Sequence, residues 1–208
     1  MNKGIGQYDL EYSSCSCFWG TEPGKFVRPI PDLLGHQGTV LDIGAGEGKN
    51  SIFLASAGFT VTAIEVSVFA VHNFSVQLEK LDLEIQNRIT IINEDILSFD
   101  DVKSYDVVIA YGLLHCLSSL ADVEKTVNKI KQLTKLNGVV VIVSFNNELG
   151  VPKVQEYLEP TLLPKDYLLK AFNSWTIIEY ENGIITETHP TTNIEHQHSV
   201  TRLIAKFC

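Results

Sequence analysis

The chain has 208 residues, enough for one α/β domain with a sizeable core and too few for two comfortable ones. Hydrophobic residues make up 45% of it and charged residues 20%, as in an ordinary soluble protein. The formal net charge of -9 argues against a nucleic-acid substrate, because binding to phosphates normally requires a basic patch and none is visible. These properties favour small-molecule chemistry, by a monomer or a homodimer.

The N-terminal segment, residues 1–37, precedes the first predicted strand and lacks the apolar core of a signal peptide. The longest apolar run of strand type, 139–143, is far too short to span a membrane. We therefore expect a cytoplasmic protein without a membrane partner. The stretch from Phe18 to Phe26 is rich in aromatic and turn residues. It is expected either to cap a ligand site or to pack as an arm.

A buried strand over 40–43 runs into a turn containing Gly44, Gly46 and Gly48, and a helix is predicted over 51–57 with Gly58 as its cap. Glycines at alternate positions let the backbone approach a ligand closely, although a plain tight turn has the same pattern. The next strand, 60–64, ends at Glu65, 17 residues after Gly48. A carboxylate at that point can accept both hydroxyls of a ribose. A nucleoside-bearing cofactor is therefore predicted across the first two strands.

The charges around this turn indicate which cofactor fits. The spacing is Gly-x-Gly-x-Gly instead of the Gly-x-Gly-x-x-Gly of dinucleotide folds, and Asp42 and Glu47 flank and interrupt it. Two carboxylates would repel a pyrophosphate but suit a ligand that carries an ammonium and a sulfonium group. A nicotinamide-dependent oxidoreductase is accordingly disfavoured.

At Asp42, Gly44, Gly46, Gly48 and Glu65 the chain resembles the class I methyltransferases that use S-adenosylmethionine. The resemblance implies that the turn cradles the methionine part and that the acid of the second strand holds the ribose. It also implies an adenine site at an acid after the third strand, which is predicted over 88–92. The residues assigned to the cofactor are Asp42, Gly44, Ala45, Gly46, Gly48, Asn50, Glu65, Val66, Asp95, Ile96 and Tyr111.

The rest of the chain continues the alternation of helix and strand. Helical spacing follows the cap residue Ser67, and a strand is predicted over 105–110. A helix from Leu120 ends at Asn137-Gly138 before an apolar strand over 139–143. A short helix over 165–172 leads to strands over 175–180 and 199–207, which form a hairpin because no helix separates them. The predicted fold of 38–208 is a doubly wound, mostly parallel, seven-stranded α/β sheet whose last strand is antiparallel.

Three histidines are predicted at the carboxyl ends of the strands, where ligands bind in such sheets. His115 follows the fourth strand, and His196 and His198 lie in the connection after the sixth. Each is a candidate general base with a pKa near neutrality, and a structural or solvated role is the alternative. His196 and His198 point to one side of a strand, but no third ligand is evident, so no metal site is expected. The four cysteines are expected to be reduced thiols.

Two stretches resemble the small bacterial methyltransferases of the tellurite-resistance and thiopurine-methyltransferase-like groups: 41–65, and the C-terminal residues 168–180 followed by 200–206. The likeness implies a soft acceptor, such as a thiol or an oxyanion of selenium or tellurium. Glu65 stands where many of these relatives have Asp. Methylation of an oxygen or nitrogen of a metabolite with a histidine base is an alternative, as is a binding protein for S-adenosylmethionine without turnover.

Overall fold

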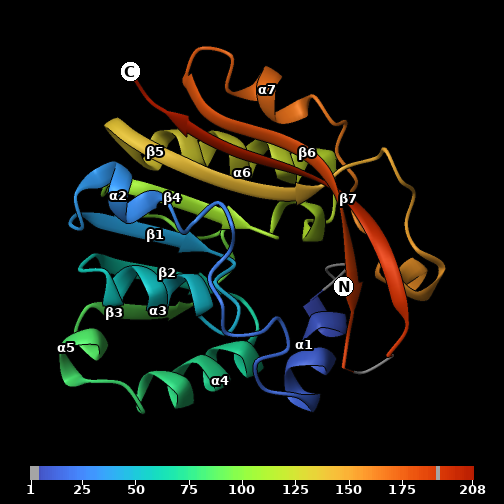
Figure 1. Ribbon diagram of the computed structural model, residues 1–208, viewed down its shortest axis with the longest axis horizontal. Helices are drawn as coiled ribbons and strands as arrows, with labels where there is room; N and C mark the ends of the chain where they lie inside the picture. Colours follow the sequence, from blue (N-terminus) through green and yellow to red (C-terminus); the bar gives the residue numbers. More distant parts are fainter. Residues whose placement is uncertain (1–4, 191–192) are drawn as a thin grey trace.

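Seven strands form one sheet in the computed structural model, which describes residues 5–190 and 193–208 (Figure 1). Their order across the sheet is β3-β2-β1-β4-β5-β7-β6. Strands β1 to β5 are parallel, and β7 is antiparallel to both of its neighbours, β5 and β6. The predicted fold class is therefore confirmed. The strands are β1 (Thr39–Ile43), β2 (Thr60–Glu65), β3 (Ile89–Asn93), β4 (Tyr105–Tyr111), β5 (Thr134–Phe145), β6 (Thr176–Thr188) and β7 (Glu195–Lys206).

Helices cover both faces of the sheet (Figure 1). Alternate residues of β1 point to opposite faces, so Val40 belongs to one apolar cluster while Leu41 and Ile43 belong to the other. The cluster that contains Val40 packs against α2, α3 and α4. The cluster that contains Leu41 and Ile43 packs against α6 and α7. The helices are α1 (Ile5–Ser14), α2 (Ile30–Leu34), α3 (Lys49–Ser56), α4 (Val68–Leu78), α5 (Leu83–Gln86), α6 (Leu120–Leu133) and α7 (Tyr167–Ala171), with 3-10 turns η1 (Leu114–Cys116) and η2 (Lys153–Leu158). No helix among the described residues is long and apolar enough to cross a membrane.

The boundary between α6 and β5 differs from the prediction. The helix ends at Leu133 instead of at Asn137-Gly138, and Thr134 already pairs with Tyr105 of β4. Asn137 has a φ of 66° and its N–H donates to the Phe207 carbonyl over 2.7 Å. The turn-like dipeptide is therefore an irregularity inside the sheet, held by β7, and not the end of a helix.

The β6–β7 hairpin is much longer than the predicted strands at 175–180 and 199–207. Only the part of β7 from Val200 onward pairs with β5, and 195–199 pairs with β6 alone. In Figure 1 this outer part of the hairpin curves away from the sheet toward α1. Apart from Ile184 and Ile185 its residues are mostly polar, so it lacks the apolar pattern by which a strand is recognised in sequence.

Candidate active site

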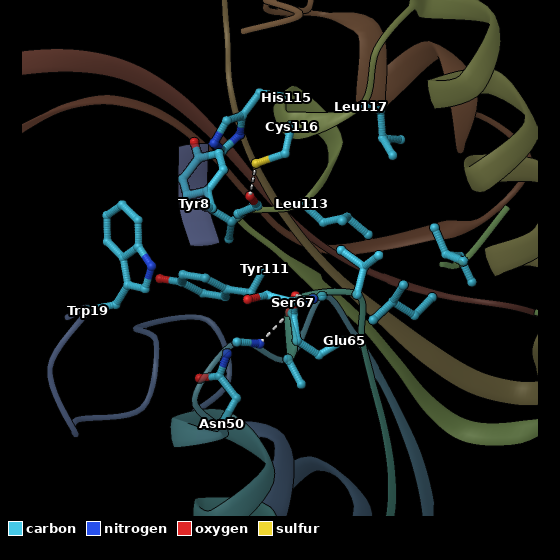
Figure 2. Close-up of a pocket in the computed structure, with 18 of the residues that line it drawn as sticks. Tyr8, Trp19, Asn50, Glu65, Ser67, Tyr111, Leu113, His115, Cys116 and Leu117 are labelled. Carbon is cyan, nitrogen blue, oxygen red and sulfur yellow. Dashed lines mark hydrogen bonds between the residues drawn. The ribbon is translucent and has the colours of Figure 1, made fainter. Parts of the chain in front are cut away.

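A cavity of about 590 Å³ opens at the carboxyl ends of the parallel strands (Figure 2). This volume lies within the range of small-molecule sites. Its wall is built by segments that follow β1, β2, β3 and β4, together with residues of the N-terminal segment. Nine of the eleven residues assigned to a cofactor line it: Gly44, Ala45, Gly46, Asn50, Glu65, Val66, Asp95, Ile96 and Tyr111.

The glycine turn supplies backbone to the cavity at two positions. Gly44 and Gly46 line it, with φ values of 69° and 55° that disfavour other residues. The N–H groups of Gly44 and Ala45 both donate to the Ile64 carbonyl, which fixes the turn against β2. Gly48 has a different neighbour, because a Cβ on it would lie 2.1 Å from the Phe74 ring. Its lack of a side chain lets α4 pack against the turn.

Glu65 is the buried acid at the end of β2. One of its oxygens accepts from the Gly46 N–H over 2.8 Å and the other from the Ser67 N–H over 2.9 Å. Burial raises the pKa of this carboxyl, and the backbone donors oppose that shift. Figure 2 shows Glu65 beside Ser67 in the pocket. The side chain thus couples the turn after β1 to the loop after β2.

Asp42 is not one of the described residues that line the cavity. It lies buried beneath the glycine turn. Ser51 of α3 donates its hydroxyl to the Asp42 carboxylate over 2.7 Å. Burial raises the pKa of Asp42 to about 6. The residue therefore supports the start of α3. Asp95, by contrast, lines the cavity and accepts from the Leu97 N–H over 2.9 Å, which shapes the loop after β3.

Glu47 has a role that the sequence did not indicate. Its two oxygens accept from the N–H groups of Cys17 and Phe18, each over 2.7 Å. Lys49 donates to the Trp19 carbonyl, and the Asn50 side chain accepts from the Gly24 N–H. The glycine turn and the first turn of α3 therefore hold the N-terminal segment. Three side chains of that segment line the cavity: Tyr8, Tyr12 and Trp19.

His115 is the one histidine among the described residues that line the cavity. Its Nδ1 accepts from the Phe145 N–H over 3.2 Å, so in the neutral ring the proton resides on Nε2. Burial, and then repulsion from His198, lower the pKa of His115 to about 3. Figure 2 shows the ring beside Tyr8 and Cys116. At neutral pH the group is an uncharged hydrogen-bond donor.

The other two histidines lie behind this wall. The Phe145 ring stacks on His115 at 3.9 Å and on His198 at 4.0 Å between centroids. His196 and His198 are both buried on β7, and neither is among the described lining residues. Their neighbour across the hairpin, Glu187, does line the cavity. The structure thus brings His115 to the cavity and gathers the other pair around Glu187.

Comparison with known proteins finds relatives of one kind. Residues 41–140 match a family described as a methyltransferase domain. The chain is 33% identical over 107 residues to a ubiquinone biosynthesis O-methyltransferase of Rickettsia typhi, covering 51% of this chain and 41% of that protein. It is 24% identical over 152 residues to the probable S-adenosyl-L-methionine-dependent methyltransferase TehB of Haemophilus influenzae, covering 73% and 50%. The chain thus spans half or less of the length of these curated relatives.

Solved structures share the fold. The crystal structure of TehB from Haemophilus influenzae superposes with a TM-score of 0.73 at 18% identity, covering 88% of this chain and 61% of that one. N-methyltransferase NodS from Bradyrhizobium japonicum, in complex with S-adenosyl-L-homocysteine, gives 0.70 at 12% identity and 99% coverage of both chains. The domain match, the curated relatives and the shared fold together support the class I S-adenosylmethionine-dependent methyltransferases, the family that the glycine turn and strand-end acids predict.

Proposed function

We propose that the protein transfers a methyl group from S-adenosylmethionine to a small-molecule acceptor in the cavity of Figure 2. The observation that carries this proposal is the convergence of the glycine turn, Glu65 and Asp95 on one cavity from the ends of three neighbouring strands. The net charge of -9 supports a small acceptor over a nucleic acid.

The lining residues fit the cofactor of this family. Gly44 and Gly46 leave the backbone uncrowded for the methionine part. Each Glu65 oxygen accepts one backbone hydrogen bond and keeps a lone pair for a ribose hydroxyl. Asp95 and Ile96, which line the cavity after β3, are the proposed contacts of the adenine. When bound, the cofactor supplies an electrophilic methyl group on a sulfonium, so the protein's own task is to align the acceptor and exclude water.

The N-terminal segment, with Tyr8, Tyr12 and Trp19, is proposed as the cap that excludes water, while 38–208 forms the catalytic domain. Glu47, Lys49 and Asn50 hold this segment in place through its backbone. Aromatic faces also attract a sulfonium cation. Because the cap is held by its backbone, its aromatic side chains remain available to contact the ligand.

The state of His115 favours a soft acceptor, either a thiol or an oxyanion of selenium or tellurium. A neutral ring with its proton on Nε2 can donate a hydrogen bond to an anionic acceptor, whereas its other nitrogen is already used by the Phe145 N–H. An acceptor that is already anionic needs little help from a base. Lys49 and Arg202 also line the cavity and add positive charge.

Methylation of an oxygen or nitrogen of a metabolite is the second candidate, because Glu187 lines the cavity and burial raises the pKa of its carboxyl. Such a carboxylate is a possible general base. His196 and His198, two of the three candidate bases from the sequence, would then act on the acceptor through Glu187.

The experiment is to measure release of S-adenosylhomocysteine by the full chain with a panel of acceptors. We expect turnover with aliphatic and aromatic thiols, tellurite or selenite. We also expect that a plot of the rate against pH shows no change of slope near pH 6.5, where an ordinary histidine titrates. Turnover confined to catechols or amines would transfer the assignment to the second candidate. Binding of S-adenosylhomocysteine without turnover of any acceptor would indicate a binding protein. The Glu65→Ala variant controls for contaminating activity.

A further inference from the structure

Four titratable side chains meet on one face of the outer β6–β7 hairpin. Glu187 is the direct cross-strand partner of His196, and such partners share a face of the sheet. His198 lies two residues along the same strand, so it shares that face as well. His189 follows Glu187 by two residues at the end of β6. The register of the hairpin thus brings His196 and His198 to the Glu187 carboxylate, and the end of β6 adds His189.

The atoms that face one another in this cluster have no hydrogen-bond partner. Glu187, His196 and His198 each present a ligand atom, and these atoms lie within 4.8 Å of one another. The Glu187 Oε2 is 3.9 Å from the His198 Nε2 and 4.0 Å from the His189 Nε2. That oxygen and the Nε2 atoms of all three histidines are buried and unpartnered. The three histidines are 7%, 9% and 3% exposed, in chain order.

The backbone sets the orientation of one imidazole. His196 Nδ1 lies 2.9 Å from the Ile194 carbonyl oxygen. Because a carbonyl can only accept, Nδ1 carries the proton and Nε2 presents a lone pair to the cluster. Histidines that bind metals through one ring nitrogen are commonly oriented in this way, because the other ring nitrogen donates a hydrogen bond to a carbonyl. Burying this lone pair and three other polar atoms without partners is unfavourable, because each loses its hydrogen bonds to water and gains none in the protein.

We propose that Glu187, His196 and His198, with His189 as a fourth donor, bind one divalent transition-metal ion of the Zn²⁺ type. Imidazole nitrogen and carboxylate oxygen are ligands of this ion class, and Zn²⁺ takes four of them in a tetrahedron. Bonds of about 2.0 Å place tetrahedral ligands roughly 3.3 Å apart. Small side-chain rotations would bring the 3.9 and 4.0 Å separations to that value.

The position of this cluster indicates what the ion would connect. Glu187 also lines the main cavity. The His189 ring stacks on Phe18 at 5.3 Å and meets the edge of Trp19 at 5.1 Å between centroids. An ion at this point would tie the hairpin to the N-terminal segment beside the acceptor site. Lys49 interacts electrostatically with Glu187, so the ion would share this carboxylate with a nearby ammonium group.

The test is Zn²⁺ binding by the full chain after removal of metal with EDTA and dialysis. We expect one equivalent to bind in calorimetry, and affinity to fall at least 100-fold in His196→Ala and in His198→Ala. His72→Ala is the matched control, because His72 is an exposed histidine on α4 and should leave binding unchanged. Equal binding by wild type and both cluster variants would overturn the proposal, as would no binding by folded wild type.

A second measurement on the wild type decides the matter if the alanine variants fail to fold. X-ray absorption of the Zn²⁺-loaded chain should show a first shell of nitrogen and oxygen with outer-shell scattering from at least two imidazoles. Sulfur in the first shell would place the ion at cysteines and contradict the proposal. Binding of S-adenosylhomocysteine is measured on the same samples. Failure of the metal site therefore remains distinguishable from failure of the proposed methyl transfer.

Discussion

At the scale of single residues, Glu65 connects the two loops that form the cofactor side of the cavity. Its carboxylate is buried and accepts from the backbone of both the glycine turn and the β2 loop. Hydrogen bonds to a charged acceptor are among the stronger ones in proteins. The residue therefore shapes the site in addition to offering lone pairs to a ligand.

We predict that Glu65→Ala weakens binding of S-adenosylhomocysteine at least tenfold, which corresponds to about 1.4 kcal/mol. The variant loses the acceptor for the ribose and also leaves the Gly46 and Ser67 N–H groups without a partner. Titration calorimetry measures the change, and Glu79→Ala at the exposed end of α4 is the control. Wild-type affinity in Glu65→Ala would refute the assignment of this pocket to the cofactor.

The glycines offer a second prediction at this scale. Gly48 and Gly35 have similar φ values, 83° and 75°, but an added Cβ collides with Phe74 at Gly48 and meets nothing within 4 Å at Gly35. We expect Gly35→Ala to cost roughly 1 kcal/mol of stability through backbone strain alone. Gly48→Ala should cost a further ~1–3 kcal/mol through overpacking. Chemical denaturation measures both, and equal losses would show that α4 yields to the added methyl group.

The sequence could predict the residues whose roles are local. A turn followed by a strand-end acid fixes the neighbourhood of Gly44, Gly46 and Glu65 through the parallel pairing of β1 with β2. Glu47 could not be assigned in this way. Its partners, Cys17 and Phe18, lie about 30 residues away in a segment without strand or helix periodicity. From the sequence alone, this charge among glycines indicates only a ligand contact; Glu47 does line the cavity, and its anchoring role emerges only from the fold.

At the scale of elements, the N-terminal segment depends on the glycine turn that leads into α3. Glu47 accepts two of its backbone N–H groups and a third hydrogen bond from Asn73 of α4. One carboxylate therefore joins three parts of the chain. The aromatic residues that line the cavity from this segment are positioned by that joint.

We predict that Glu47→Ala releases this segment. Trypsin should cleave after Lys25 about tenfold faster than in the wild type, and S-adenosylhomocysteine should dissociate faster, because two backbone groups lose a charged acceptor. Glu22→Ala is the control, since its side chain is 83% exposed and only pairs with Arg28 at the surface. Unchanged proteolysis in Glu47→Ala would mean that the segment is held elsewhere.

The β6–β7 hairpin is the element that the sequence predicted least well. Its inner half has the apolar residues of a strand, such as Leu203 and Ile204, but its outer half is mostly polar apart from Ile184 and Ile185. Register there is set by pairing across a long connection, so Glu187 could not be placed opposite His196 in advance. Because the sequence does not give the register of this hairpin, it offers no third metal ligand beside His196 and His198.

At the scale of the whole molecule, the order of the sheet places every predicted ligand loop at one end. The glycine turn, Glu65 and Asp95 follow three neighbouring parallel strands, and His115 follows the fourth. The same packing that forms the cavity withdraws Asp42 and His115 from water. Both groups are therefore ionisable and buried. Burial raises the pKa of Asp42 and lowers the pKa of His115.

These two groups give opposite contributions to stability against pH. The pKa of His115 falls from 6.5 to about 3 in the folded protein, so between these values only the unfolded chain binds the proton. Acidification through this window therefore favours unfolding. The pKa of Asp42 rises from 3.8 to about 6, so between these values only the folded chain binds the proton. Acidification there favours folding.

We predict that the two substitutions change the slope of stability against pH in opposite senses between pH 4.5 and 5.5. In His115→Gln the free energy of unfolding should fall less steeply on acidification than in the wild type, by about 1.4 kcal/mol per pH unit at most. In Asp42→Asn it should fall more steeply by a similar amount, because the stabilising proton uptake is lost. Urea unfolding of the EDTA-treated proteins at each pH measures both slopes. Parallel curves for the three proteins would show that neither side chain is as strongly withdrawn from solvent as its burial indicates.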